Sequence, residues 1–206
     1  MTESSSPVCY ANLSVYRCTG DELRTRLDDL ARLRIAVFRA WPYLYDGDMG
    51  YERDYLKRYD RARTGTIIMA ADGEAIVGAS TALALDEEAD YVRAPFVAAG
   101  LKTADIFYFG ESVLLPQYRG HGIGVQFFDQ REAAARAHGY KTCCFCAVQR
   151  PDSHPMKPAD YAPLDAFWMK RGYLRQPQLV ASFKWQDIGS TEQTSKPMVY
   201  WMKHLS

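Results

Sequence analysis

Apolar residues recur along the chain with two different periods, which separate helices from strands. A spacing of three residues, as in Leu27, Leu30 and Leu33, places apolar side chains on one face of a helix. Such spacing, together with stop signals, predicts helices over residues 22–38, 51–62, 125–138 and 164–171, with a further short helix within 87–99. An aromatic loop, residues 41–47, separates the first two.

Shorter apolar runs rich in Ile, Val and Thr predict strands, over residues 12–18, 66–71, 75–85, 105–115, 141–148, 179–185 and 198–202. The short turn at residues 72–74 predicts a hairpin. Helix 125–138 lies between strands 105–115 and 141–148 and predicts a crossover. We therefore expect an α/β (α+β) fold with a mostly antiparallel, mixed sheet of about six to seven strands flanked by helices.

The composition fits one globular domain. The chain has 206 residues, of which 48% are hydrophobic, enough to bury a core. We assign residues 1–206 to a single domain and expect residues 1–8 to form a flexible tail. The 25 basic and 25 acidic residues give no net charge, which argues against nucleic acid and membrane surfaces as partners. No apolar stretch has the length of a signal sequence or membrane span, so we expect a cytoplasmic protein.

The cysteine run at residues 143–146 spells C-x-x-C, a spacing found in metal and redox sites. It lies in an apolar strand, where Cys143 and Cys146 would point to opposite faces of the sheet and could not bind one ion together. We expect no metal site and interpret these residues as buried thiols in a reducing compartment.

Three glycines, Gly120, Gly122 and Gly124, follow strand 105–115 and precede helix 125–138. A glycine-rich turn at a helix N-terminus presents free backbone N–H groups to an anion, commonly a phosphate. The spacing excludes the dinucleotide fingerprint G-x-G-x-x-G, and the lysine of a nucleoside-triphosphate loop is missing. The alternative is a turn that only joins the strand to the helix.

Residues 117–124, QYRGHGIG, resemble the Q/R-x-x-G-x-G/A motif of the GNAT superfamily of N-acetyltransferases, and residues 167–173, FWMKRGY, are similar to its F-Y-x-x-x-G-F/Y segment. The resemblance implies a GNAT-like fold whose sheet is splayed where acyl-CoA binds. It implies acetyl-CoA as the acyl donor, bound by Leu114, Leu115, Gln117, Arg119, Gly120, His121, Gly122, Ile123 and Gly124. In this arrangement residues 119–124 surround the pyrophosphate, and the N–H of Leu114 or Leu115 is the candidate donor to the oxyanion.

Acyl transfer to an amine also needs a base. Glu111 is the candidate, because strand alternation would place it in one row with Phe107, Phe109 and Val113, where apolar neighbours raise the pKa of a carboxyl. The alternative is a structural glutamate paired with an arginine or lysine.

The proton donor to the leaving thiolate is not evident. Similar enzymes commonly have a tyrosine where this chain has Trp168, and an indole N–H cannot serve as that acid. Tyr161, Tyr173 and His154 are candidates by residue type, as is Tyr108, although each has a structural interpretation as well. A CoA thiolate can also leave without protonation, since the pKa of a thiol is modest.

The acceptor side is less well defined. Tyr43, Tyr45 and Tyr51 lie between the first two helices, where similar enzymes build part of the acceptor pocket, and we take them with Trp168 as candidate substrate-binding residues. Packing is the alternative role of such an aromatic loop.

The sequence thus predicts an N-acyltransferase that moves acetyl from acetyl-CoA to a primary amine of a small molecule, peptide or protein. The alternatives are a CoA-binding module that has lost catalysis, suggested by Trp168, and an O-acyltransferase on the same scaffold. Dimers are frequent among similar proteins, so the resemblance also allows a homodimer.

Overall fold

The structure is a computed structural model that describes residues 12–18 and 21–206, so the predicted tail, residues 1–8, lies outside the described residues. Its strands are β1 (Leu13–Cys18), β2 (Thr66–Asp72), β3 (Ala75–Ala84), β4 (Ile106–Leu114), β5 (Thr142–Val148), β6 (Leu174–Gln186) and β7 (Gln193–His204). Its α-helices are α1 (Asp21–Phe38), α2 (Met49–Arg61), α3 (Asp90–Ala98), α4 (Ile123–Ala137) and α5 (Asp165–Met169).

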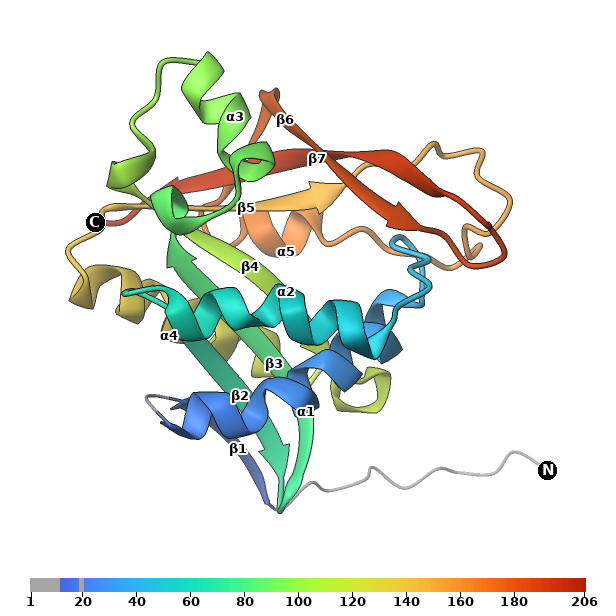
Figure 1. The fold of residues 1–206 in the computed structure, drawn as a ribbon, viewed down its shortest axis with the longest axis horizontal. Coiled ribbons are helices and arrows are strands. Elements are labelled where there is room, and N and C mark those ends of the chain that lie inside the picture. Colours follow the sequence, from blue (N-terminus) through green and yellow to red (C-terminus); the bar gives the residue numbers. More distant parts are fainter. Residues whose placement is uncertain (1–11, 19–20) are drawn as a thin grey trace.

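The strands form one sheet in the order β1-β2-β3-β4-β5-β7-β6 (Figure 1). Neighbours are antiparallel except β4 and β5, which are parallel and joined through α4. A parallel pair needs a connection long enough to hold a helix, whereas antiparallel strands can be joined by a short turn. The predicted mixed, mostly antiparallel sheet is therefore confirmed.

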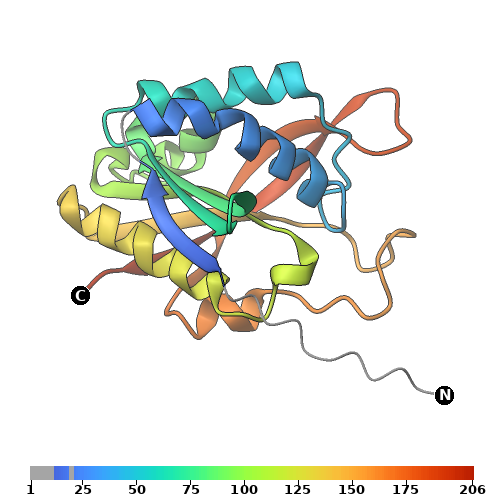
Figure 2. The ribbon, with the colours of Figure 1, turned by 90° about the horizontal axis from the view of Figure 1, so that it is seen from below.

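Helices cover both faces of the sheet (Figure 2). On one face α1 and α2 bury Leu30 and Leu56, and α3 buries Phe96. On the other face α4 buries Phe127 and Phe128, and α5 lies beside it. Each helix turns its apolar stripe toward the sheet, as its periodic pattern requires. None of the helices in the described residues is long and apolar enough to span a bilayer.

The last two strands extend beyond their predicted bounds of residues 179–185 and 198–202. β6 is an edge strand whose register shifts between Gln176 and Val180, around Pro177, which has no N–H to donate. Polar, exposed residues at a sheet edge do not show the apolar pattern by which strands are recognised, so the sequence pattern missed these ends.

A β-bulge interrupts the pairing of β4 with β3. Between Phe109 and Ser112, two residues of β4, Gly110 and Glu111, oppose the single residue Thr81 of β3. A bulge of this kind shifts the alternation of side chains by one position. Its placement decides where the candidate base points.

The bulge overturns the predicted row of residues 107, 109, 111 and 113 on one face. Phe107 and Phe109 pack against α4, whereas Val113 packs against α1 and α2. Glu111 also faces these two helices, since its side chain contacts Arg34 of α1. The prediction was wrong because alternation persists only while strands pair one residue to one.

Side chains of the neighbouring elements hold the bulge in place. The Glu111 N–H donates to the hydroxyl of Thr81 at 3.1 Å, and this hydroxyl donates to that of Tyr59 at 2.8 Å. A Cβ on Gly110 would lie 2.1 Å from the Tyr59 hydroxyl and 2.6 Å from that of Thr81. The bulge therefore needs glycine at this position.

Replacing Gly110 by alanine is expected to destabilise the fold by about 2–3 kcal/mol, because the buried Tyr59 and Thr81 have no room to move. Urea unfolding followed by circular dichroism would measure this as a lower midpoint at unchanged slope. The matched control is Gly50→Ala in the first turn of α2, where the nearest atom to the new Cβ is a side-chain oxygen of Asp48 at 3.1 Å. An equal loss in both variants would show that the bulge does not require glycine.

Candidate active site

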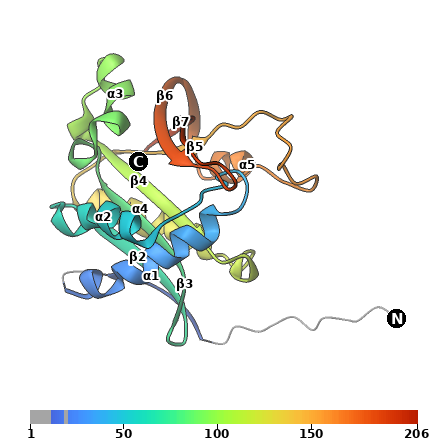
Figure 3. The ribbon, with the colours of Figure 1, turned by 45° about the vertical axis from the view of Figure 1, so that its right-hand side comes forward.

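β4 and β5 separate from each other after a short paired segment. They pair only over Ile106–Tyr108 and Thr142–Cys144, although both strands continue beyond. Figure 3 shows β5 and the β6–β7 hairpin diverging from the first half of the sheet. We call the opening between residues 109–114 and 145–148 the fork. β4 pairs with β3 and β5 with β7 on their other sides, but the backbone groups that face the fork pair with no strand in the described part of the chain.

The hydrogen bonds of β4 show which of its backbone groups point into the fork. The Leu115 N–H donates to the carbonyl of Val77 at 3.0 Å, toward β3. Since these groups alternate along a strand, those of Ser112 and Leu114 point the other way, toward β5. Of the two candidate oxyanion donors, Leu114 therefore faces the fork, and Leu115 is engaged within the sheet. The sequence analysis missed Ser112, whose direction depends on the bulge.

The glycine loop connects β4 to α4. Gly120 and Gly122 have φ angles of 83° and 79°, in the left-handed region that favours glycine, and Gly122 caps α4. A Cβ at either position would meet no atom within 4 Å, so the space around them is open. Neither N–H has a backbone acceptor among the described residues. Together with the helix N-terminus, these features fit a phosphate group.

The other predicted loop residues divide into an exposed and an anchored set. The side chains of Gln117 and Arg119 are exposed, and Nδ1 of His121 lies 2.9 Å from the Arg119 carbonyl. Ile123 is buried in the core, and Gly124 is half-buried beside it. The loop thus presents polar groups outward while Ile123 fixes the start of α4.

A cavity of about 410 Å³ opens beside the bulge, on the face covered by α1 and α2. Its charged lining residues are Arg34, Glu111 and Lys184. Its aromatic lining residues are Phe38, Tyr43, Tyr45, Tyr51, Tyr55, Tyr91, Tyr108, Phe183 and Trp185. The structure therefore brings three of the predicted substrate residues, Tyr43, Tyr45 and Tyr51, into one cavity with the candidate base.

Glu111 takes part in a buried ion-pair network. It is 4% exposed, and its Oε2 lies 2.6 Å from Nη1 of Arg34. The same guanidinium contacts Glu52 of α2 through Nε. Tyr55 donates its hydroxyl to Glu111 at 3.4 Å, and the Arg34 guanidinium lies 4.2 Å from the centre of its ring. Glu111 is thus both paired, as the structural alternative proposed, and located at the cavity wall.

The network retains acceptor capacity. Oε1 of Glu52 and Oε1 of Glu111 have no hydrogen-bond partner among the described residues. Two carboxylates share one guanidinium, so the network carries a net negative charge when both are ionised. Burial raises the pKa of Glu111, and the adjacent Arg34 opposes that shift. The site can therefore accept a proton or attract a cationic ligand.

Comparison with known proteins agrees with this geometry. Residues 30–158 match the acetyltransferase (GNAT) family. The chain belongs to this family. Members use acetyl-CoA as the acetyl donor, which fits the fork and the open glycine loop. None of the curated proteins matches the chain in sequence.

Solved acetyltransferases share the fold at low sequence identity. An N-acetyltransferase from Staphylococcus aureus Mu50 aligns with a TM-score of 0.59 and 12% identity over 95% of this chain and 99% of its own. A ribosomal-protein-alanine N-acetyltransferase from Brucella melitensis aligns with a TM-score of 0.60 and 13% identity, over 93% of this chain and 99% of its own. A GNAT family acetyltransferase from Elizabethkingia anophelis, with acetyl-CoA bound, aligns with a TM-score of 0.52 and 12% identity, over 94% of this chain and 99% of its own.

Three of the acid candidates of this GNAT protein, Tyr173, His154 and Tyr161, are not among the residues that line the cavity. Tyr173 is fully buried and donates its hydroxyl to Glu132 of α4 at 3.1 Å. His154 and Tyr161 pack around Trp41, with ring centroids 5.0 and 6.0 Å from its own. These contacts give each of them a structural role.

Tyr108 and Trp168 lie on opposite faces of the sheet. Tyr108 lines the cavity, and its hydroxyl is 3.3 Å from Sγ of Cys146. Trp168, predicted to bind substrate, instead packs on the α4 side, with ring centroids 5.1 Å from those of Phe145 and Trp201. Trp168 therefore does not line the cavity.

The cysteines of β5 are separated by the sheet. Cys143 packs toward α4, and Cys146 lies on the cavity side. Burial raises the pKa of both thiols to about 12, which disfavours the reactive thiolate. Within residues 12–18 and 21–206, no group of three or more His, Cys, Asp or Glu side chains is placed to hold a metal ion.

Arg131 of α4 supports the bulge from the opposite face and was missed by the sequence analysis. It is 2% exposed and lies over the rings of Phe109 and Phe128. It donates to the carbonyl of Phe127 at 3.1 Å and to that of Glu111 at 3.4 Å. An arginine within a helical pattern is normally solvated, so the sequence carried no sign of this role.

Arg150 fixes the outer wall of the cavity. Its guanidinium donates to the carbonyls of Pro42 and Tyr43 at 3.0 and 2.7 Å, and to both carboxylate oxygens of Asp187 at 2.9 and 2.7 Å. The Trp185 indole donates to the same Tyr43 carbonyl at 3.0 Å. These bonds tie the aromatic loop to the β6–β7 hairpin.

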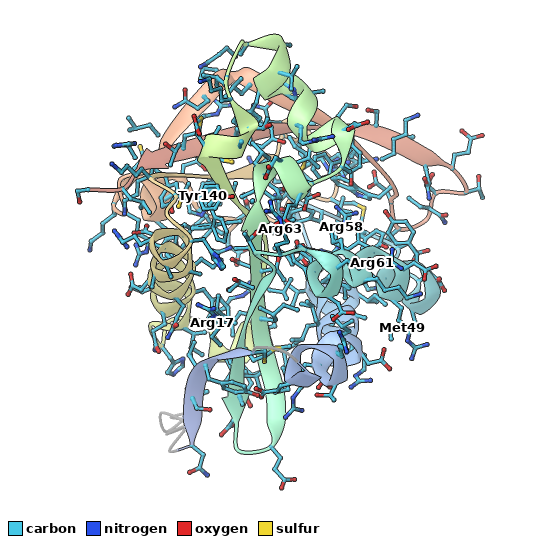
Figure 4. The ribbon with its side chains drawn as sticks, turned by 60° about the vertical axis from the view of Figure 1, so that its left-hand side comes forward. Arg17, Met49, Arg58, Arg61, Arg63 and Tyr140 are labelled. Atoms are coloured by element: carbon cyan, nitrogen blue, oxygen red, sulfur yellow. The ribbon has the colours of Figure 1, made fainter. Side chains whose placement is uncertain are left out.

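Arg58 of α2 supports Tyr55, which donates its hydroxyl to Glu111. Figure 4 shows Arg58, Arg61 and Arg63 at and just beyond the C-terminal end of α2. Arg58 contacts the buried carboxylate of Glu88 and lies 4.0 Å from the ring centre of Tyr55. Tyr55 is therefore held by guanidinium groups of both α1 and α2.

Replacing Arg34 by methionine would leave two buried carboxylates without their shared counter-charge. We expect a loss of about 3–5 kcal/mol of unfolding free energy at pH 7. Glu111, whose pKa burial already raises, would then bind a proton more readily in the folded than in the unfolded state. The destabilisation therefore grows as pH rises through the folded-state pKa of Glu111 and shrinks below it.

Urea unfolding at pH 7 and pH 5 would measure this difference. The matched control is Arg32→Met on the same helix, whose side chain is 62% exposed and pairs with Asp29 at the surface. It is expected to change stability by less than about 1 kcal/mol. If Arg34→Met lost the same unfolding free energy at pH 7 and at pH 5, the assignment of a charged buried network would be contradicted.

Proposed function

We propose that the protein transfers an acetyl group from acetyl-CoA to a primary amine bound in the aromatic cavity, with Glu111 as the general base. One observation carries the proposal: the bulge directs the Glu111 carboxylate into the cavity while the next residues of the same strand, from Ser112 on, border the fork. Donor and acceptor sites would then meet at one short segment of β4.

The fork and the glycine loop would hold the donor. The backbone groups of Ser112 and Leu114 are available to pair with amide groups, as a neighbouring strand would. The N–H groups of Gly120 and Gly122 and the N-terminus of α4 suit a pyrophosphate. When bound, acetyl-CoA supplies an activated acetyl thioester. Either Ser112 or Leu114 could donate an N–H to the carbonyl oxygen that gains charge in the reaction.

Glu111 would take the proton of the attacking amine. Its Oε1 is without a partner among the described residues, and Arg34 and Tyr55 fix the other oxygen. A raised pKa makes a carboxylate a stronger base, provided that it is still ionised at the working pH. No dedicated acid is required, because a thiolate is a good leaving group.

Replacing Glu111 by glutamine would remove the base while keeping the shape of the site. We expect turnover to fall about 10²–10⁴-fold with unchanged affinity for acetyl-CoA. In the wild type, kcat/KM should fall as pH decreases through the raised pKa of Glu111, because the protonated carboxyl cannot accept a proton. This limb should be absent from the variant. Thiol release would measure turnover, and calorimetry would measure acetyl-CoA binding.

The control is Glu74→Gln in the exposed β2–β3 turn, which should leave both readouts unchanged. If the Glu111→Gln variant kept the turnover and pH dependence of the wild type, Glu111 would be rejected as the base. A wild type that binds acetyl-CoA but acetylates no amine would favour a CoA-binding module, and acetylation of alcohols alone would favour an O-acyltransferase.

Replacing Gly122 by alanine tests the donor site. A Cβ would project into the open space at the loop, and at φ 79° a non-glycine residue costs about 1–2 kcal/mol. We expect acetyl-CoA to bind about tenfold more weakly or worse. Gly189→Ala is the matched control, because Gly189 has a φ of 78° and equally open surroundings in the β6–β7 turn. Equal weakening in both variants would attribute the effect to backbone strain rather than to the loop.

A further inference from the structure

The cavity walls consist of aromatic rings that packing holds in place. The Tyr43 ring lies 4.3 Å from that of Phe38 and 5.9 Å from that of Trp185, measured between centroids. Tyr51 and Tyr55 stack at 6.4 Å. Rigid rings lose little freedom on binding and offer flat apolar faces, which favour a flat partner over a flexible chain.

The cavity offers one carboxylate to an ammonium group. Among the described residues, Glu111 is the one carboxylate in the lining, and a carboxylate accepts hydrogen bonds from an ammonium group. The other charged lining residues, Arg34 and Lys184, are cationic. A second ammonium group would therefore find repulsion and no further carboxylate, which disfavours polyamines.

The size of the cavity and its fixed outer wall favour a small molecule. Its volume of about 410 Å³ lies at the lower end of the range of roughly 300–1,000 Å³ for small-molecule sites. Arg150 ties the aromatic loop to Asp187, which fixes the wall that a bulky acceptor would have to displace.

From these observations, and resting on the proposed function, we infer that the acceptor is a primary monoamine carried by a short arm on a flat apolar body, as in an arylalkylamine. The amine nitrogen binds on the side of the cavity where Glu111 lies, and the body lies between the aromatic walls. The new C–N bond forms as the thioester C–S bond breaks. The bound ammonium group first gives one proton to Glu111 and attacks as the free amine. The second N–H proton passes to solvent water, and CoA leaves as the thiolate.

A panel of amines tests this substrate class on the wild-type protein. Thiol release would be followed with acetyl-CoA and 2-phenylethylamine, n-hexylamine, spermidine or a lysine peptide with a blocked N-terminus. We expect kcat/KM for 2-phenylethylamine to exceed that for hexylamine about tenfold, given the strength of aromatic contacts. Spermidine and the peptide should be poorer still.

A substitution in the cavity wall tests whether the cavity causes the preference for 2-phenylethylamine over hexylamine. Tyr51→Ala is suited to this test, because its side chain is 51% exposed and the fold should tolerate the change. We expect KM for 2-phenylethylamine to rise about three- to tenfold, with a smaller change for hexylamine. Val97→Ala, at a position 65% exposed on α3 and outside the cavity lining, is the matched control.

The outcomes separate the two proposals. Preference for spermidine or the peptide would overturn the monoamine class while leaving the acetyltransferase intact. An equal rise of KM for 2-phenylethylamine and for hexylamine in Tyr51→Ala would also overturn the proposed acceptor class while leaving the acetyltransferase intact. Absence of turnover with every amine, despite acetyl-CoA binding, would overturn the proposed function and the acceptor class with it.

Discussion

The two-to-one pairing at Gly110 and Glu111 is the constraint on which the rest of the site depends. With regular pairing, Glu111 would point at α4, beside the rings of Phe107 and Phe109. The bulge turns its carboxylate toward α1 and α2, where Arg34 can pair with it. The same shift leaves the backbone groups of Leu114 directed at the fork. One extra residue thus turns the Glu111 carboxylate to one face of the strand and leaves the backbone groups of Leu114 facing the fork.

The ion-pair network of Arg34, Glu52 and Glu111 is explained better by a role in function than by a role in stability. Replacing a buried ion pair with apolar residues of similar volume is often neutral or stabilising, so such a network is weak evidence for a role in folding. Here Arg34 pairs with two carboxylates, and within the described residues each carboxylate keeps one oxygen without a hydrogen-bond partner. An incompletely satisfied buried network is costly unless a ligand completes it. An amine in the cavity would add a positive charge beside Glu111, the member of the network that lines the cavity.

The sequence predicts those parts of the molecule that local patterns specify. The order of the elements, the mixed sheet and the glycine loop follow from periodicity and from the need for positive φ at Gly120 and Gly122. The bulge does not, because it is a property of two paired strands rather than of one. Arg34 and Arg150 lie in segments where arginine is ordinarily solvated, and only the tertiary arrangement shows their partners.

In the proposed site, the half for the acetyl donor is recognisable from the sequence and the half for the acceptor is not, because the two halves are built from different groups. The donor half uses backbone groups, whose position requires specific residues such as glycine at specific spacing, so it leaves a motif in the sequence. The acceptor half uses side chains from α1, the aromatic loop, β4 and the β6–β7 hairpin, and many combinations can enclose a cavity. Structural neighbours at 12–13% identity can therefore share the fold without sharing an acceptor. In this protein the limits on the acceptor are set by the aromatic walls and by Glu111, which within the described part of the chain is the one carboxylate that lines the cavity.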